Sequence, residues 1–88
     1  MTLIPVEVAP RFRRAYKKKP IEMRAAVDRT VLQLRTDPRY PELHTHKVLG
    51  SPGVWEAYMD QANRLTFCWR EDTIVLLNHC NHDILKRA

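Results

Sequence analysis

Four histidines and a strand arginine are the side chains whose types and spacing could do chemistry in this sequence. His44 and His46 lie close together in the middle of the chain, and His79 and His82 lie close together near its end. Because the imidazole pKa is near neutrality, a histidine can act as a general base or a general acid. An arginine such as Arg64 can neutralise a phosphate whose charge grows during a reaction. The set meets the needs of metal-free RNA cleavage, which are a base for the ribose 2′-hydroxyl, an acid for the leaving 5′-oxygen and a cation.

The same region allows a metal site as an alternative interpretation. Its possible ligands are His44, His46, His79, Cys80, His82 and Asp83. Zinc accepts these ligand types, but neither cluster has the paired C-x-x-C spacing of a zinc finger. We therefore expect neither a metal nor another cofactor. Any single histidine can instead be a structural hydrogen-bonding group at the end of a strand, and we expect this role for His44 and His79.

Length and composition indicate one domain in the reducing cytoplasm. The chain has 88 residues, 44% of them hydrophobic, which fits a single domain over residues 1–88. No apolar run approaches the roughly 20 residues that span a bilayer, and the N-terminus lacks the features of a signal peptide. Cys68 and Cys80 are too few for a disulfide scaffold, and neither has the surroundings of a nucleophile. Cytoplasmic localisation is therefore expected.

The net charge of +5 and the isoelectric point of about 9.6 predict an anionic partner. Much of the positive charge lies in one segment near the N-terminus, formed by Arg11, Arg13, Arg14, Lys17, Lys18 and Lys19. A helix with these side chains could bind the phosphates of a nucleic acid or an acidic protein, but a solvated helix face has the same composition. Charge alone therefore favours nucleic acid without identifying it.

Hydrophobic periodicity predicts an α+β fold, in which a two-helix hairpin packs on a small, mostly antiparallel sheet. The first strand covers residues 3–9, and the two helices begin at Pro10 and Pro20, the second ending at Asp37. Residues 39–53 have no clear periodicity and form a connector, which at this length is more often functional than idle. The last three strands cover residues 54–60, 64–70 and 73–78, which gives the order β-α-α-β-β-β.

Alternation along the two hairpin strands separates a core face from a polar face. The core face is expected to carry Trp55, Ala57, Met59, Leu65, Phe67 and Trp69. The opposite, open face is expected to carry Glu56, Tyr58, Asp60, Arg64, Thr66 and Cys68. On that face Arg64 could hold a phosphate and Tyr58 could stack on a base, although an ordinary solvated face also contains such residues.

Several segments, taken in order, carry a resemblance to a known family. They are Phe12-Arg13-Arg14-Ala15-Tyr16-Lys17-Lys18 with Pro20, the helix exit from Leu34 to Pro38, Leu43-His44-Thr45-His46-Lys47-Val48-Leu49-Gly50, Gly53-Val54-Trp55-Glu56-Ala57-Tyr58, Asn63-Arg64-Leu65-Thr66-Phe67, and Ile74-Val75-Leu76-Leu77 with His82-Asp83 downstream. Over almost its whole length the sequence resembles the RelE/ParE superfamily of type II toxins. The resemblance implies the same helical hairpin on a mostly antiparallel sheet.

The resemblance also implies a toxin that is neutralised by an antitoxin protein wrapped around it. RelE-like members cleave mRNA in the decoding site of the ribosome, without a metal, by attack of the 2′-hydroxyl. ParE-like members instead inhibit DNA gyrase and have no known nuclease role. The histidines and the polar sheet face favour a ribosome-dependent endoribonuclease. The alternatives are a non-enzymatic gyrase inhibitor and an inactive module that only binds an antitoxin.

Position by position, the resemblance implies a catalytic set based on histidine. Arg64 matches the strand arginine that holds phosphate in nuclease members, and His46 matches a catalytic histidine of the connector in one branch. His82 matches a C-terminal catalytic histidine, which other branches replace with arginine. We expect His46 and His82 to share the base and acid roles. The binding residues expected around them are Lys47, which adds positive charge, Tyr58, which supports a base in preference to Trp55, and Asp83, which orients His82.

Overall fold

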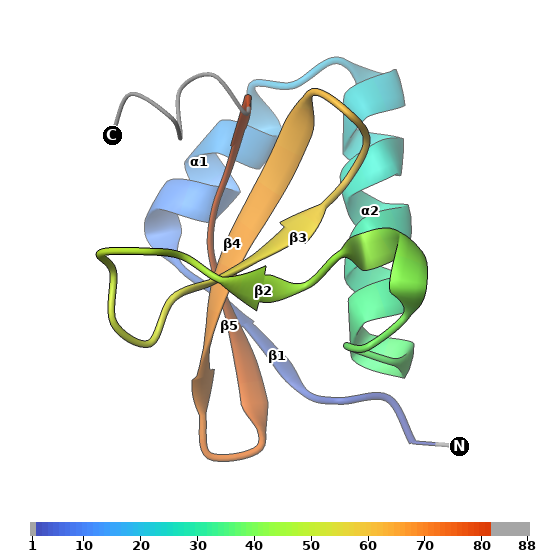
Figure 1. Cartoon of the computed structure of the whole chain (residues 1–88). Helices are drawn as coiled ribbons and strands as arrows, with labels where there is room; N and C mark the ends of the chain where they lie inside the picture. The colour runs from blue at the N-terminus through green and yellow to red at the C-terminus, as the bar shows by residue number, and fades with distance from the viewer. Residues whose placement is uncertain (1, 82–88) are drawn as a thin grey trace.

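Helices α1 and α2 lie against one face of a five-stranded sheet in the computed structural model, which describes residues 2–81 (Figure 1). The elements along the chain are β1 (Val6–Val8), α1 (Pro10–Lys17), α2 (Ile21–Thr36), a short 3₁₀ helix η1 (Pro41–Leu43), β2 (His46–Lys47), β3 (Trp55–Tyr58), β4 (Asn63–Arg70) and β5 (Thr73–Asn81). This arrangement confirms the expected α+β fold of a helical hairpin on a small sheet.

The strands lie side by side in the order β1-β5-β4-β3-β2. Strand β1 runs parallel to β5 and the other pairs are antiparallel, so the sheet is mixed but mostly antiparallel, as expected. Strand β2 is an addition to the expected order, because His46 and Lys47 pair with Glu56 and Trp55 at the edge of the sheet. The connector, expected to be irregular, therefore places His46 on the sheet.

Helix α1 begins at Pro10, as the sequence predicts, and α2 begins one residue after the predicted Pro20 and ends before Asp37. Pro10 occupies the first turn of α1, where its missing amide hydrogen costs no helical hydrogen bond. Helix α2 ends before Asp37, because the proline at position 38 disfavours helical angles in the preceding residue. The stripe of α2 that carries Val27 and Leu34 is buried against the sheet. Within residues 2–81, neither helix has the length and apolar composition of a membrane span.

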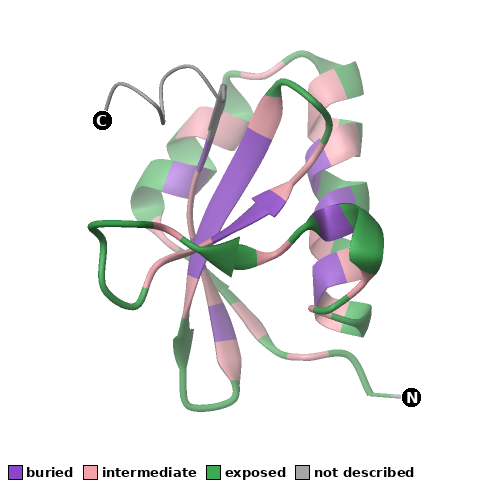
Figure 2. Cartoon of the chain, in the orientation of Figure 1, coloured by how far each residue is buried: buried purple, intermediate pink, exposed green. Residues whose placement is uncertain are grey.

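The core lies between the helices and the middle of the sheet (Figure 2). Its buried side chains are Phe12, Val27, Leu34, Leu43, Ala57, Leu65, Phe67, Ile74 and Leu76. Burying one large apolar side chain contributes about 1.5–3 kcal/mol, so this set is the main stabilising term. Trp69 was expected in the core but is 39% exposed, because it stands near the end of β4 at the edge of a pocket.

The sheet face turned away from the helices is not the open, solvated surface that strand alternation predicts. Glu56, Arg64 and Thr66 are only 7%, 4% and 7% exposed. The register of β3 and β4 places Tyr58 opposite Arg64 and Glu56 opposite Thr66, so these side chains can cover one another. Charged groups buried together need partners, since an isolated buried charge is strongly unfavourable. The contacts that satisfy them define the candidate site.

Candidate functional site

Arg64 is the centre of the site and is held from several sides. Its Nη1 donates hydrogen bonds to the backbone carbonyls of Asp60 and Asn63. Its Nε lies 3.4 Å from Oε1 of Glu56, an ion pair whose geometry falls short of a hydrogen bond. The guanidinium carbon lies 3.5 Å from the centroid of the Tyr58 ring, a cation–π contact. These contacts fix one positive charge at the β3–β4 hairpin.

Glu56 connects Arg64 to His46 across neighbouring strands. The carboxylate oxygen that faces Arg64 also lies 3.6 Å from Nε2 of His46, because β2 pairs His46 directly with Glu56. Glu56 and Arg64 are both buried, so water screens their interaction weakly, whereas the His46 side chain is 48% exposed and its contact with Glu56 is screened more. Strand alternation alone assigns no role to Glu56, since its contact with His46 depends on the pairing of β2. The signal in the sequence that points to Glu56 is strand alternation, which places Glu56 on the same sheet face as Arg64.

The ring of His46 is oriented by a backbone carbonyl of the connector. Its Nδ1 lies 2.6 Å from the carbonyl oxygen of His44. A carbonyl can only accept a hydrogen bond, so we assign the Nδ1 hydrogen to this contact, which leaves Nε2 facing Glu56. His44 itself has φ 46°, a left-handed conformation that is uncommon outside glycine. The connector thus turns at His44 with its carbonyl against His46.

The Tyr58 ring lies next to Arg64 and to the two connector histidines, His44 and His46. The Tyr58 ring centroid lies 4.8 Å from that of His44 and 6.1 Å from that of His46. A hollow of about 600 Å³ lies beside Tyr58 and Arg64, and its walls are formed by Glu42, His44, Tyr58, Met59, Asp60, Gln61 and Arg64, without His46. This volume lies within the range of small-ligand pockets. A ligand in it would meet the side chains of His44, Tyr58 and Arg64 together.

Asp60 shapes the turn that carries Arg64. Its carboxylate accepts hydrogen bonds from the backbone amides of Ala62 and Asn63, at 2.8 Å and 2.7 Å, and from the Asn63 side chain. Partial burial raises the pKa of Asp60, but these hydrogen bonds and the charge of Arg64 lower it by more, so the net pKa is lowered. The carboxylate therefore stays ionised and keeps the hairpin turn closed.

Lys47 and Trp55 lie together, away from Arg64. The Lys47 Nζ is 5.6 Å from the centroid of the Trp55 ring. Successive strand residues point to opposite faces, so Trp55 faces the helix side of the sheet while Glu56 faces the site. Tyr58, and not Trp55, is therefore the aromatic residue that contacts Arg64 and could stack on a base next to it.

His79 lies apart from this cluster, on the core face of β5. It is 5% exposed, pairs with Leu65 in the sheet, and its ring centroid lies 4.8 Å from that of Phe12. Burial, and secondarily the charge of Lys19, lowers the pKa of His79, so the neutral ring is favoured. The ring is buried in the core, but its Nε2 has no hydrogen-bond partner among the described residues, so the hydrogen-bonding role expected from the sequence stays a prediction.

His82 and Asp83, the expected acid and its orienting partner, lie outside the described residues. Strand β5 ends at Asn81, which pairs with Asn63 next to Arg64. Within residues 2–81, no group of three or more histidine, cysteine, aspartate or glutamate residues is placed to hold a metal ion.

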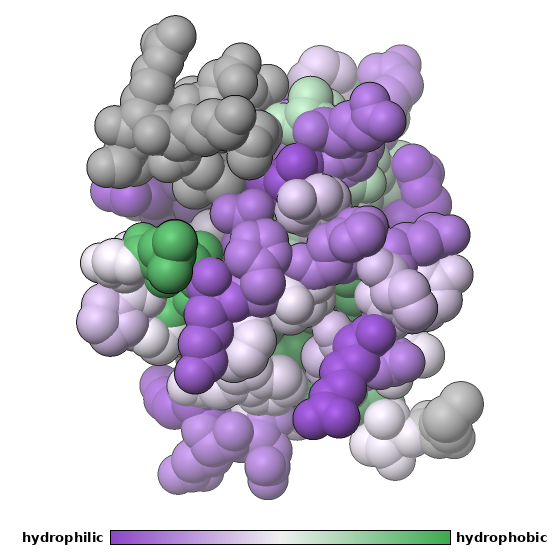
Figure 3. Space-filling view, in the orientation of Figure 1, coloured by the Kyte–Doolittle hydropathy of each residue, from purple (hydrophilic) through white to green (hydrophobic). Residues whose placement is uncertain are grey.

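The cationic segment around α1 divides between two surfaces. Arg11, Arg14, Lys18 and Lys19 line one small hollow, whereas Arg13 and Lys17 border an apolar groove between α1 and α2. Hydrophilic side chains also gather over β2 and β3, and a strongly hydrophobic spot lies over the loop that joins them, where Leu49 is 96% exposed (Figure 3). The polar surface at β2 and β3 suits a ligand with phosphate groups better than an apolar one.

No protein-family model and no curated protein sequence matches this chain. Solved structures do match. A copper-bound mutant toxin from Helicobacter pylori is 17% identical with a TM-score of 0.73, covering 94% of this chain and 99% of that one. The toxin–antitoxin complex RelBE2 from Mycobacterium tuberculosis is 21% identical with a TM-score of 0.72, and the match covers 92% of this chain and 100% of that one. The RelE–RelB complex from Pyrococcus horikoshii is 14% identical with a TM-score of 0.71, and the match covers 91% of this chain and 96% of that one. The chain therefore has the fold of the RelE/ParE superfamily of toxins, as the resemblance in its sequence predicts.

Proposed function

We propose that this protein is the toxin of a type II toxin–antitoxin system, acting as a metal-independent, ribosome-dependent endoribonuclease that cleaves mRNA. The observation that carries the proposal is the line of His46, Glu56 and Arg64, in which one buried carboxylate faces both an imidazole nitrogen and a guanidinium. Solved structures with this fold include toxin–antitoxin complexes, which supports an antitoxin as partner. The hollow beside Arg64, where a guanidinium meets the rings of His44 and Tyr58, supports RNA as the substrate.

In the proposed mechanism, His46 is the general base. With its Nδ1 hydrogen directed at the carbonyl of His44, Nε2 takes the proton of the ribose 2′-hydroxyl. The 2′-oxygen attacks the adjacent phosphorus, and the bond to the 5′-oxygen breaks. Glu56, which faces Nε2 at 3.6 Å, stabilises the imidazolium that forms. The products are a 2′,3′-cyclic phosphate and a 5′-hydroxyl end.

Arg64 neutralises the phosphate as it gains charge. Its Nε faces Glu56 and its Nη1 donates to two backbone carbonyls, so Nη2 is the nitrogen that we assign to a phosphate oxygen. Tyr58 covers the guanidinium and supports the base of the neighbouring nucleotide, and Lys47 adds positive charge at the edge of the sheet. His82 gives the proton to the leaving 5′-oxygen, and Asp83 orients His82.

A purified translation reaction with a defined mRNA tests this function by primer extension. We expect cuts inside the translated message, and none where a single 2′-deoxynucleotide replaces the ribose at a cut. His46→Ala and Arg64→Ala should each slow cleavage by roughly 100-fold or more. Arg70→Gln is the matched control, because Arg70 is an exposed strand arginine whose ion pair with Glu7 is on the surface.

The opposite result assigns another function. Intact mRNA in that reaction, together with inhibition of DNA supercoiling by gyrase, would replace the nuclease with the gyrase inhibitor. Undiminished cleavage by Arg64→Ala would remove the proposed site while keeping the activity. The three outcomes separate the function, its rival and the assignment of residues.

A further inference from the structure

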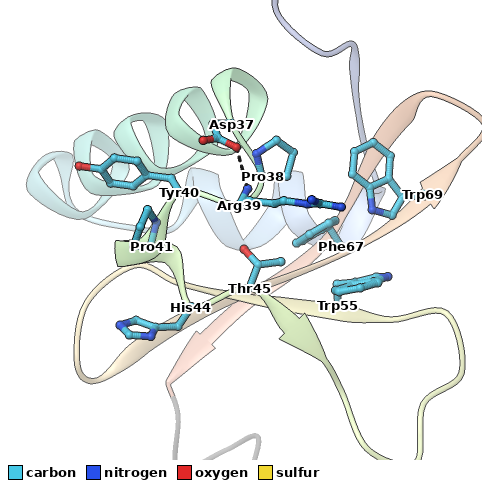
Figure 4. A pocket seen from close by; sticks show the side chains of 10 residues that line it. All are labelled: Asp37, Pro38, Arg39, Tyr40, Pro41, His44, Thr45, Trp55, Phe67 and Trp69. Atoms are coloured by element: carbon cyan, nitrogen blue, oxygen red, sulfur yellow. Dashed lines mark hydrogen bonds between the residues drawn. The ribbon is translucent and has the colours of Figure 1, made fainter.

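A second pocket, on the helix side of the sheet, is lined by both tryptophans of the chain (Figure 4). Its volume is about 740 Å³, and it opens between the loop after α2 and strands β3 and β4. Trp55 comes from β3, and Phe67 and Trp69 come from β4, with the last two rings 6.2 Å apart in a T-shaped arrangement. Because 39% of Trp69 is exposed, this aromatic wall remains accessible from solvent.

Arg39 brings a charged group to the same pocket. The Arg39 side chain extends from the loop toward the aromatic wall (Figure 4). Among the described residues, no carboxylate forms a salt bridge with the Arg39 guanidinium. The Asp37 carboxylate accepts a hydrogen bond from the backbone amide of Arg39, at 2.9 Å. The hydroxyl of Thr45 is buried without a hydrogen-bond partner in this part of the chain. Because this oxygen is inaccessible to solvent, it does not face the open pocket, and Arg39 is the charged group that a ligand would meet there.

We propose that this pocket binds one nucleotide of single-stranded RNA, with the base against the tryptophans and a phosphate against Arg39. Aromatic side chains stack on any base, and arginine pairs with phosphate oxygens through parallel hydrogen bonds. The Lys47 ammonium lies 5.6 Å from the centroid of the Trp55 ring but does not line the pocket. The rings of Trp55 and Trp69 together with the guanidinium of Arg39 form a site for a base and its phosphate.

The pocket lies next to the hollow that holds Arg64. His44 lines both cavities, and Trp55 and Glu56 are neighbours on β3 that point to opposite faces. Strand β2 is the edge of the sheet, so an RNA strand that crosses this edge reaches both cavities. The bound nucleotide is therefore one that flanks the cleaved linkage, an assignment that rests on the proposed function for its substrate.

Tryptophan fluorescence reports directly on this pocket, because the chain has two tryptophans and both line it. The full-length protein is titrated with a single-stranded RNA tetranucleotide whose 2′-O-methyl riboses prevent cleavage. We expect quenching, with affinity reduced roughly ten-fold by Trp69→Leu, the scale of losing one stacked base. Trp69→Phe should recover much of the loss. Arg39→Gln should weaken binding several-fold and flatten its salt dependence, whereas Arg11→Gln, a matched charge change on α1, should weaken it less.

Failure of the pocket and failure of the nuclease give different results. Quenching that persists in His46→Ala but falls in Arg39→Gln supports the pocket, even if no mRNA is cleaved. Absence of quenching while the wild-type protein cleaves mRNA overturns the pocket and leaves the nuclease intact. Equal losses of RNA affinity in Arg39→Gln and Arg11→Gln would show that only the net charge matters, and this result would also overturn the pocket. Quenching by a leucine-rich or phenylalanine-rich peptide but not by the tetranucleotide would assign the pocket to a protein partner.

Discussion

Glu56 and Arg64 form an ion pair across strands β3 and β4, with 3.4 Å between Oε1 and Nε, and both side chains are almost fully buried. They are not directly opposite in the register, where Glu56 faces Thr66 and Arg64 faces Tyr58. The pair is therefore diagonal, and the long arginine side chain makes it possible. Because one oxygen of Glu56 also faces His46, the carboxylate holds the positions of two groups of the proposed site.

Removing Glu56 should cost stability as well as activity. Glu56→Ala leaves the Arg64 guanidinium buried without its counter-charge, so we expect unfolding free energy to fall by about 3 kcal/mol in urea titrations. The double variant Glu56→Ala/Arg64→Met should regain a large part of this loss, since no unpaired charge remains. Strictly additive losses in the two single variants and the double variant would show that the pair is not coupled.

Glu56→Gln separates position from charge in the proposed reaction. Glutamine fills the same space but cannot stabilise an imidazolium on His46 as a carboxylate does. We expect the variant to lose stability, because Arg64 keeps no counter-charge, and, under conditions where it is folded, to cleave mRNA more slowly by roughly ten-fold or more. Cleavage at the wild-type rate in Glu56→Gln would show that the carboxylate has no part in the chemistry.

His79 should make the fold sensitive to mild acid. Burial lowers the pKa of His79 in the folded protein below its usual value near 6.5, so the unfolded chain binds the proton first as the pH falls. Stability is therefore expected to decrease as the pH drops through about 6.5 and to level off below the folded-state pKa. Thermal unfolding of the wild-type protein and His79→Leu between about pH 7.5 and pH 5 measures this. His79→Leu should have the smaller slope, and equal slopes would contradict the assignment.

Asp60 should respond in a more acidic range. The pKa of Asp60 is lowered in the folded protein. Its contribution to stability is therefore complete when the pH is above the pKa of the unfolded state, and it is lost as the pH falls through the lower pKa of the folded state. Asp60→Ala should cost about 1 kcal/mol near neutral pH, because two backbone amides of the turn lose their acceptor. The difference between Asp60→Ala and the wild-type protein should shrink in strong acid, and a difference independent of pH would argue against this role.

His44 offers a test of backbone conformation. Glycine usually destabilises a protein relative to alanine, but at φ 46° the side-chain Cβ is strained and glycine is not. We expect His44→Gly to be more stable than His44→Ala by about 1 kcal/mol in denaturant unfolding. The two variants lose the same ring contact with Tyr58, so the comparison isolates the backbone. Greater stability in His44→Ala would mean that the left-handed turn is not needed.

Local signals in the sequence predict the helices and the hairpin strands well. Pro10, Pro20 and the proline that follows Asp37 mark helix boundaries through restrictions that act within a residue or two. The fold class and the role of Arg64 as a strand residue follow from such local rules. Strand alternation also separates Tyr58 and Arg64 from the core face.

The burial of the polar face and the makeup of the site depend on contacts between distant segments. The connector has no periodicity, yet its residues His46 and Lys47 pair with β3 and bring an imidazole to Glu56. Periodicity measures which face a residue occupies, and it carries no information on which chain segment covers that face. The sequence by itself therefore determined the two helices, the strands other than β2, their order along the chain and the charge. Only the tertiary structure decided that Glu56 joins His46 to Arg64 and that Trp55 and Trp69 share a pocket, because pairing across strands and packing of loops are non-local.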